Sequence, residues 1–188
     1  MPRSREQFSE MKDERLNSIC GAALPLFSLY GKKVSIDAIS NKAKCSHGIV
    51  YHYFKNSDEI YEKLLKSSTF VELCNRLFNI NEGSSYEKIE QIISVLLDVS
   101  EDKFENVCYL NIIIKSEERN SLSSVLAKLI KEGQNSGKII AGEPEQVVNT
   151  LFFLFKGIYL SFLQEKHPII KVPSLENVMQ LIRKPLLF

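Results

Sequence analysis

The sequence predicts an all-α protein, in which an N-terminal helix-turn-helix head precedes a larger helical body. Apolar residues recur at three- and four-residue intervals along the chain, as they do on one face of an α-helix. Residues that favour helix N-caps precede several of these runs, and turn-forming residues separate them. Only Ile112–Ile114, taken alone, is also compatible with a strand. We therefore expect two domains, with residues 1–56 forming the head and residues 57–188 the body.

Composition and charge describe an ordinary globular protein with a mildly basic head. The chain has 188 residues, of which 44% are hydrophobic and 25% charged. Residues 1–66 contain 11 Lys or Arg against 8 Asp or Glu, whereas residues 67–188 contain 13 against 15. The net positive charge of the head is compatible with binding to phosphates, whereas the net charge of the body is negative.

The head begins with a long amphipathic helix over residues 12–30. Its apolar residues recur at helical spacing, and Gly31 follows as a helix-ending residue. Residues 1–11 carry charges of both signs and show no apolar period. We therefore expect them to form an arm outside the helix, whose arginines could reach DNA.

Two short helices joined by a tight turn follow this first helix. Ser35 is expected to cap a helix that ends near Lys42. Residues 43–45 form the turn, and Ser46 caps a second helix that runs through Phe54. This arrangement is a helix-turn-helix, whose second helix enters the major groove of DNA.

The outer face of the second helix supplies candidate DNA contacts. With Val50 facing the core, the 100° turn per residue leaves Gly48, Ile49 and His52 on the outer arc. His47 lies at the helix tip, where recognition helices touch base edges. Lysines and hydroxyl groups nearby are suited to phosphates. The full candidate set is Lys33, Ser35, Lys44, Ser46, His47, Gly48, Ile49, Tyr51, His52, Tyr53 and Lys55.

The sequence S-H-G-I-V-Y-H-Y-F-K-N-S-D-E-I, residues 46–60, resembles the signature of TetR-family regulators, usually S-K-G-x-L-Y-x-Y/H-F-x-S-K-E-x-L. The sequence RLNSICGAALPLFSLYG, residues 15–31, resembles the first helix of that family. Three positions depart from the pattern: Lys44 replaces the usual turn glycine, Ser57 replaces a common lysine, and Pro25 should kink the first helix. The resemblance covers roughly the first third of the chain.

The body is expected to be helical throughout. Ser84 and Glu87 match a capping box, and Pro144 suits a first helical turn. The sequence GQNSGKIIAGEP, which starts at Gly133, is a turn-rich break between two strong helices. Helices are expected over residues 57–66, 70–80, 84–100, 104–113, 121–135, 143–166 and 174–187.

The resemblance to TetR-family regulators implies that the body holds a small-molecule pocket and a dimer interface. The apolar interior is rich in aromatic residues, as ligand pockets often are. The ligand-binding candidates are Phe70, Cys74, Phe78, Phe104, Cys108, Tyr109, Phe152, Phe155 and Tyr159. Residues 143–166 are apolar on nearly every side, so a second chain should cover part of that helix. The dimer candidates are Val148, Phe155, Ile158, Phe162, Leu175, Val178, Met179 and Ile182.

No catalytic or metal-binding pattern is present in the sequence. It has no glycine-rich phosphate loop, no H-E-x-x-H and no nucleophile elbow, so we expect neither an enzyme nor a cofactor. The start of the chain is polar, and Lys156 interrupts the apolar run Leu151–Leu163, which indicates a cytoplasmic protein. Four widely spaced cysteines without a C-x-x-C pair are expected to be reduced and structural.

These observations predict a homodimeric DNA-binding transcriptional regulator. By its resemblance it is a repressor that binds a near-palindromic operator and is released by a small apolar or amphipathic effector. Its expected partners are double-stranded operator DNA, a second copy of the chain and the effector. We expect no association with a membrane. Two alternatives are a dimeric ligand-binding module that does not bind an operator, and a thiol-based redox sensor that uses Cys45.

Overall fold

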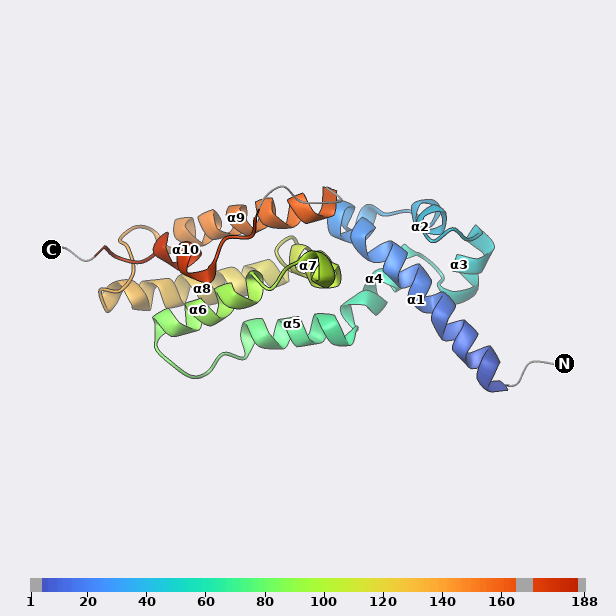
Figure 1. Ribbon diagram of the computed structural model, residues 1–188, viewed down its shortest axis with the longest axis horizontal. Coiled ribbons are helices and arrows are strands. Elements are labelled where there is room, and N and C mark those ends of the chain that lie inside the picture. The colour runs from blue at the N-terminus through green and yellow to red at the C-terminus, as the bar shows by residue number, and fades with distance from the viewer. Residues whose placement is uncertain (1–4, 165–170, 186–188) are drawn as a thin grey trace. The chain divides into compact units, whose positions relative to one another are not determined.

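The computed structural model describes residues 5–164 and 171–185, with side chains from Met11 onwards (Figure 1). The described residues form helices, turns and one isolated β-bridge, which confirms the all-α prediction. They divide into two compact units, one ending at Ser67 and the other beginning at Ser68. Each unit has its own apolar core.

The first unit contains the predicted helix-turn-helix. It consists of α1 (Arg5–Tyr30), the 3-10 turn η1 (Gly31–Lys33), α2 (Ile36–Lys42), α3 (His47–Tyr53) and α4 (Ser57–Leu65). Fully buried side chains from α1, α2, α3 and α4 make its core, namely Ile19, Phe27, Ile39, Val50 and Ile60. The arm expected over residues 1–11 is wrong from Arg5 onwards, because α1 already begins there. Residues 1–4, including Arg3, lie outside the described part of the chain.

The helix α4 packs against α1 and η1 in the first unit. The ring of Tyr61 meets that of Phe27 edge-on, with 5.1 Å between the ring centroids. The Nζ of Lys32 lies 5.3 Å from the centroid of the same Tyr61 ring. These contacts place α4 in the first unit, so the compact head extends beyond the expected boundary at residue 56.

The predicted N-caps of the head are confirmed. The side chain of Ser35 accepts a hydrogen bond from Ala38 N at 3.2 Å, and that of Asn56 accepts one from Glu59 N at 2.9 Å. The Glu59 carboxylate in turn accepts from Lys55 N at 2.7 Å, one residue before the Asn56 N that a capping box would use. Local sequence alone therefore positions the starts of these helices.

The second unit is a bundle of helices. Its elements are α5 (Ser68–Phe78), α6 (Ser85–Leu96), the 3-10 turn η2 (Glu101–Lys103), α7 (Phe104–Ile113), α8 (Glu118–Asn135), α9 (Pro144–Gln164) and α10 (Leu175–Gln180). The helix α8 packs against both α6 and α9, and α7 packs against α5 and α9 (Figure 1). Residues 112–114, which alone could form a strand, are buried at the end of α7.

The C-terminal segment pairs with the connection between α8 and α9. Ile140 N donates to Ile182 O at 2.9 Å, and Lys184 N donates to Lys138 O at 3.0 Å. This pairing is incompatible with a helix, so the last helix ends at Gln180 and the expected continuation to Leu187 is wrong. Residues 186–188 lie outside the described residues.

The helix α9 is the most apolar element of the body. It has 21 residues and is described to Gln164, so its expected end near Lys166 and the His167-Pro168 stop lie outside the described residues. Among the described helices, α9 alone is long and apolar enough to cross a membrane, with 44% of its most apolar window buried inside the protein. Core helices of soluble proteins have the same length and composition.

Candidate functional site

The helix α3 presents most of its surface to solvent. Val50 is its fully buried residue, and Ile49 and Tyr53 are half-buried. The exposed residues of the helix are His47, Gly48, Tyr51 and His52. The other DNA-contact candidates around the motif, also exposed, are Lys33, Ser35, Lys44, Ser46 and Lys55. The motif and its flanks therefore expose an imidazole at the tip of α3, the backbone at Gly48, the phenol of Tyr51 and three lysines.

The turn between α2 and α3 is closed by Lys44 in a left-handed conformation. Its φ is 51°, the one positive value among the non-glycine residues that the structure describes. Lys44 N donates to Asn41 O at 3.3 Å, and Cys45 N donates to Ser40 O at 3.0 Å. Lysine therefore occupies a position in this turn where glycine is the usual residue.

A close side-chain contact links the two helices of the motif. His47 Nδ1 on α3 lies 3.3 Å from Asp37 Oδ1 on α2, and both side chains are mostly exposed. At the other end of α3, the ring of His52 meets that of Tyr53 edge-on at 5.1 Å. Asp37 was not among the sequence-based candidates, because its relation to His47 depends on how α2 and α3 cross.

A groove of about 460 Å³ runs between the first half of α1 and the end of α3. Its walls include Lys12 and Arg15 on α1, and His52 and Tyr53 on α3. Lys12 and Arg15 are additional to the residues expected from the sequence. Their three-residue spacing places both on one face of the predicted helix, but that this face adjoins α3 depends on how the two helices pack. Both cations are exposed and adjoin α3, and Glu14 lines the same groove with the opposite charge.

The ligand-binding candidates of the body lie mainly in its core. Phe155 and Tyr159 are 0% exposed, and the Tyr159 hydroxyl donates to Leu96 O at 2.8 Å. Burial raises the pKa of the Tyr159 hydroxyl well above its ordinary value. Phe70 packs edge-on against Tyr109, with ring centroids 5.6 Å apart. These four aromatic side chains are parts of a packed interior.

The remaining ligand-binding candidates are more varied. Cys108 is fully buried, Cys74 and Phe78 are half-buried, and Phe104 is 39% exposed. Phe152 is 4% exposed and lines a small groove of about 280 Å³ at the junction of α7, α8 and α9. The candidates are thus distributed between core and surface. Phe152 is the candidate that lines a groove together with charged residues.

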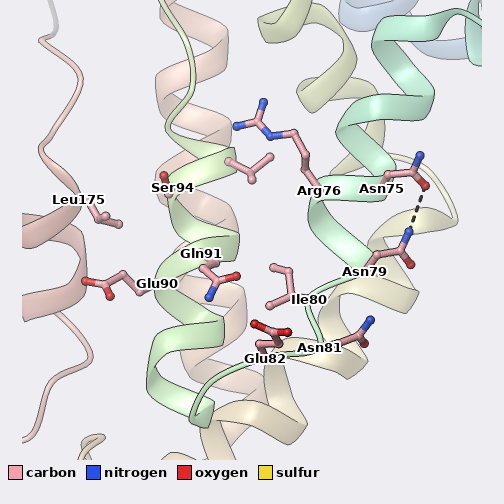
Figure 2. A pocket seen from close by; sticks show the side chains of 11 residues that line it. Asn75, Arg76, Asn79, Ile80, Asn81, Glu82, Glu90, Gln91, Ser94 and Leu175 are labelled. Carbon is pink, nitrogen blue, oxygen red and sulfur yellow. Dashed lines mark hydrogen bonds between the residues drawn. The ribbon is translucent and has the colours of Figure 1, made fainter.

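A larger groove lies between α5 and α6 (Figure 2). It measures about 740 Å³. Asn79 donates to Asn75 Oδ1 at 3.2 Å on its α5 side, while Glu90 and Gln91 line it from α6. Arg76 in the same wall donates to Asp98 at 3.0 Å, and the pKa of Asp98 is lowered, first by its hydrogen bond with Lys103. Amides and carboxylates dominate this groove, which makes it less suited to an apolar effector than to a polar one.

The cysteines show no sign of a shared reactive site. All four are described and none forms a disulfide. Burial raises the pKa of the Cys20 thiol, and burial followed by the nearby Glu118 raises that of Cys74 to about 11. A raised pKa reduces the thiolate fraction, so Cys20 and Cys74 are poor nucleophiles. Cys45 is half-buried in the turn before α3.

Comparison with known proteins finds chains of similar sequence and of similar structure. No family model matches the chain. Over 185 residues the chain is 21% identical to YhgD, an uncharacterised HTH-type transcriptional regulator of Bacillus subtilis strain 168, covering 91% of this chain and 95% of YhgD. A TetR-family regulatory protein from Rhodococcus RHA1 superposes with a TM-score of 0.59 at 14% identity, covering 89% of this chain and 96% of that one.

The chain has the TetR-family fold. A second similar structure is that of a protein described as a transcriptional regulator from Saccharomonospora viridis, in complex with choline. It has a TM-score of 0.54 and 14% identity, covering 92% of this chain and 100% of that one. These matches are regulators, which points away from the enzyme classes.

The resemblance to TetR-family proteins implies a dimer through α9 and α10, but most dimer candidates are covered within one chain. Leu175 is half-buried. The others, each at most 8% exposed, are Val148, Phe155, Ile158, Phe162, Val178, Met179 and Ile182. The exposed arc of α9 in this TetR-family fold is centred instead on Phe153, which is 73% exposed, with Gly157 exposed and Leu160 half-buried beside it.

Proposed function

We propose that this protein is a TetR-family transcriptional regulator that binds operator DNA through α3. The observation that carries the proposal is the exposure of His47, Gly48, Tyr51 and His52 on a short helix anchored by Val50. A helix of this kind fits the major groove, where its tip reads base edges and the flanking groups bind phosphates. The basic charge of the head and the similarity of the whole chain to YhgD support the same role.

The regulator acts as a homodimer in this proposal. Phe153 is 73% exposed and shares one face of α9 with exposed Gly157 and half-buried Leu160, and a second copy of the helix could cover this face. Gly157 has no atom within 4 Å of the position that a Cβ would take, so a second backbone has room to approach closely. Two-fold symmetry would place the recognition helices about one DNA turn apart, roughly 34–36 Å, so the operator should be a near-palindrome.

A small effector controls the regulator, which functions in the cytoplasm as a repressor. The choline complex of the Saccharomonospora viridis protein supports the inference that this fold accommodates small molecules. An effector shifts the equilibrium between conformations only through its different affinity for them, so it must prefer the form that does not fit the operator.

Selection of bound duplexes from random DNA tests the proposal. The full-length protein should enrich a near-palindrome, and its affinity should fall steeply with salt because phosphate contacts release counterions. Enrichment of no sequence, together with no salt-dependent binding to any duplex, would leave the alternative of a ligand-binding module without an operator.

A further inference from the structure

We propose that the groove at the junction of α7, α8 and α9 binds a small amphipathic anion, specifically a carboxylate that carries an apolar chain or ring. The groove measures about 280 Å³, a size suited to a small ligand. This inference names the chemical class of the effector, and it depends on the proposed function only for its regulatory consequence.

The charges that line the groove all have the same sign. Lys115 follows α7, Arg119 lies in the first turn of α8, and Lys156 lies on α9. The described residues that line the groove include no carboxylate. The nearby Glu118 does not line it, and its carboxylate accepts a hydrogen bond from the Ser116 hydroxyl. An anion between these three cations would gain their attraction and offset their mutual repulsion.

The guanidinium of Arg119 is held in position before any ligand arrives. It lies over the ring of Phe152, with 5.4 Å from Cζ to the ring centroid. Its Nη2 donates to Asn149 Oδ1 at 3.3 Å. A guanidinium carries five N–H donors, so others remain for the two oxygens of a carboxylate. The stacked and hydrogen-bonded position reduces the entropy that would be lost on binding.

Burial and the same group of cations affect the pKa of Lys115. Burial lowers the pKa of its ammonium group, and the charge of Lys156 lowers it further. A bound carboxylate would oppose both effects by favouring the charged form.

The groove also has an apolar side. Ile114 and Phe152 are 5% and 4% exposed and form its buried wall, and the exposed ring of Phe153 stands at its edge. Of these three side chains only Phe153 has much surface left to cover, which a simple inorganic anion would leave exposed and a chain or ring attached to a carboxylate would bury. The combination of cations and apolar walls therefore selects an amphipathic anion.

Calorimetry on the full-length protein without DNA tests this inference, with octanoate as the probe. Octylammonium carries the opposite charge, octanol carries none, and acetate lacks the chain. Octanoate should bind at least roughly 10-fold more tightly than each of these three, because ionic hydrogen bonds and chain burial both contribute. Equal binding of octylammonium would overturn the inference.

Substitutions locate the ligand. Arg119→Gln and Lys156→Gln should each weaken octanoate binding by roughly 3- to 10-fold, since each removes one charge-assisted contact. Lys128→Gln removes an exposed cation of α8 that does not line the groove, and it should leave the affinity unchanged. Circular dichroism confirms that each variant is folded. Phe153 borders both the groove and the exposed arc of α9, so its variants would not separate ligand binding from dimerisation.

Two outcomes distinguish this inference from the proposed function. If wild-type protein binds a selected operator but not octanoate, or if the Arg119→Gln, Lys156→Gln double variant binds octanoate as tightly as wild type, the groove assignment is wrong and the regulator remains. If octanoate binds as described but no duplex does, the groove assignment stands and operator binding fails.

Discussion

At the scale of single residues, Lys44 stores conformational strain in the head. Its φ of 51° costs a residue with a side chain about 1–2 kcal/mol relative to the usual helical region. Glycine avoids that cost but loses more chain entropy on folding. The two effects compete, and the left-handed penalty is the larger.

Replacing Lys44 by glycine should therefore stabilise the head by about 0.5–1 kcal/mol. Hydrogen exchange of the α2 and α3 amides in the full-length protein would show slower local opening. Lys42→Gly is the matched control, because Lys42 lies in α2 with a helical conformation and glycine should speed exchange there. Faster exchange in Lys44→Gly would show that the lysine side chain makes a contact worth more than the strain.

Gly133, unlike Lys44, is a residue whose identity the fold requires. A Cβ at this position would lie 2.3 Å from Ile139 Cδ1 and 2.7 Å from Ile139 Cγ1. Ile139 is 2% exposed and belongs to the segment that pairs with Arg183. The glycine thus lets the connection after α8 pack directly on that helix.

Gly133→Ala should lower the free energy of unfolding by about 1–3 kcal/mol, as overpacking of a core does. Thermal unfolding of the full-length protein would reveal the loss. Gly21→Ala, at an exposed position of α1 with nothing within 4 Å of the added carbon, should be neutral or stabilising. Combining Gly133→Ala with Ile139→Val should restore part of the stability, and failure to do so would exclude this clash as the cause.

At the scale of elements, α3 and the start of α1 are expected to divide the work of DNA binding. Phosphate contacts position the protein, and base contacts specify the sequence. Lys55 and Arg15 are exposed cations beside α3, whereas His47 lies at its tip.

Lys55→Ala and Arg15→Ala should weaken binding to all duplexes alike and reduce the salt dependence by about one phosphate contact each. His47→Ala should instead relax sequence preference, by roughly 1–3 kcal/mol at the base pair it reads. Fluorescence anisotropy against a panel of operator variants would measure both effects. Lys63→Ala, on the exposed side of α4, is the control. Selective loss of one base preference in Lys55→Ala would contradict its assignment to phosphate.

The turn before α3 also tests the thiol-sensor alternative. Cys45 is half-buried there, and valine has a similar volume. Cys45→Val should bind DNA as wild type does, with or without peroxide, because we assign the thiol a packing role. A peroxide response present in wild type and absent from Cys45→Val would favour the redox sensor.

At the scale of the whole molecule, dimerisation is the property on which operator recognition depends. A substitution can test dimerisation only at an exposed position, because a change in the core would unfold the chain. Phe155 and Ile158, which the sequence suggested as interface residues, are 0% and 4% exposed, so a charge at either position would unfold the body. Phe153 is exposed and tolerates a charge in the isolated chain.

Phe153→Glu should yield folded monomers that bind the operator at least roughly 10-fold more weakly, although every DNA-contacting residue remains. Analytical ultracentrifugation and anisotropy measure the two effects. Lys156→Gln, on the same helix, should remain dimeric. Wild-type protein that sediments as a monomer at micromolar concentration and still binds a single half-site tightly would refute the dimer.

The sequence by itself determined the all-α class, the helix-turn-helix and the positions of its caps. These features depend on local interactions, because a cap such as Ser35 acts within three residues and helical periodicity within one turn. The exposure of α3 followed from the same periodicity, once Val50 was taken as its inward residue.

Only the tertiary structure decided what depends on contacts between distant segments. It assigned α4 to the head through Tyr61 and Phe27, and it ended α10 early by pairing Ile182 with Ile140. It also showed that the bundle covers the dimer candidates on α9 and leaves Phe153 outside. The groove that gathers Lys115, Arg119 and Lys156 combines three segments of the chain. Periodicity shows that a helix has an apolar face, but the neighbours that cover that face depend on how the whole chain folds back on itself.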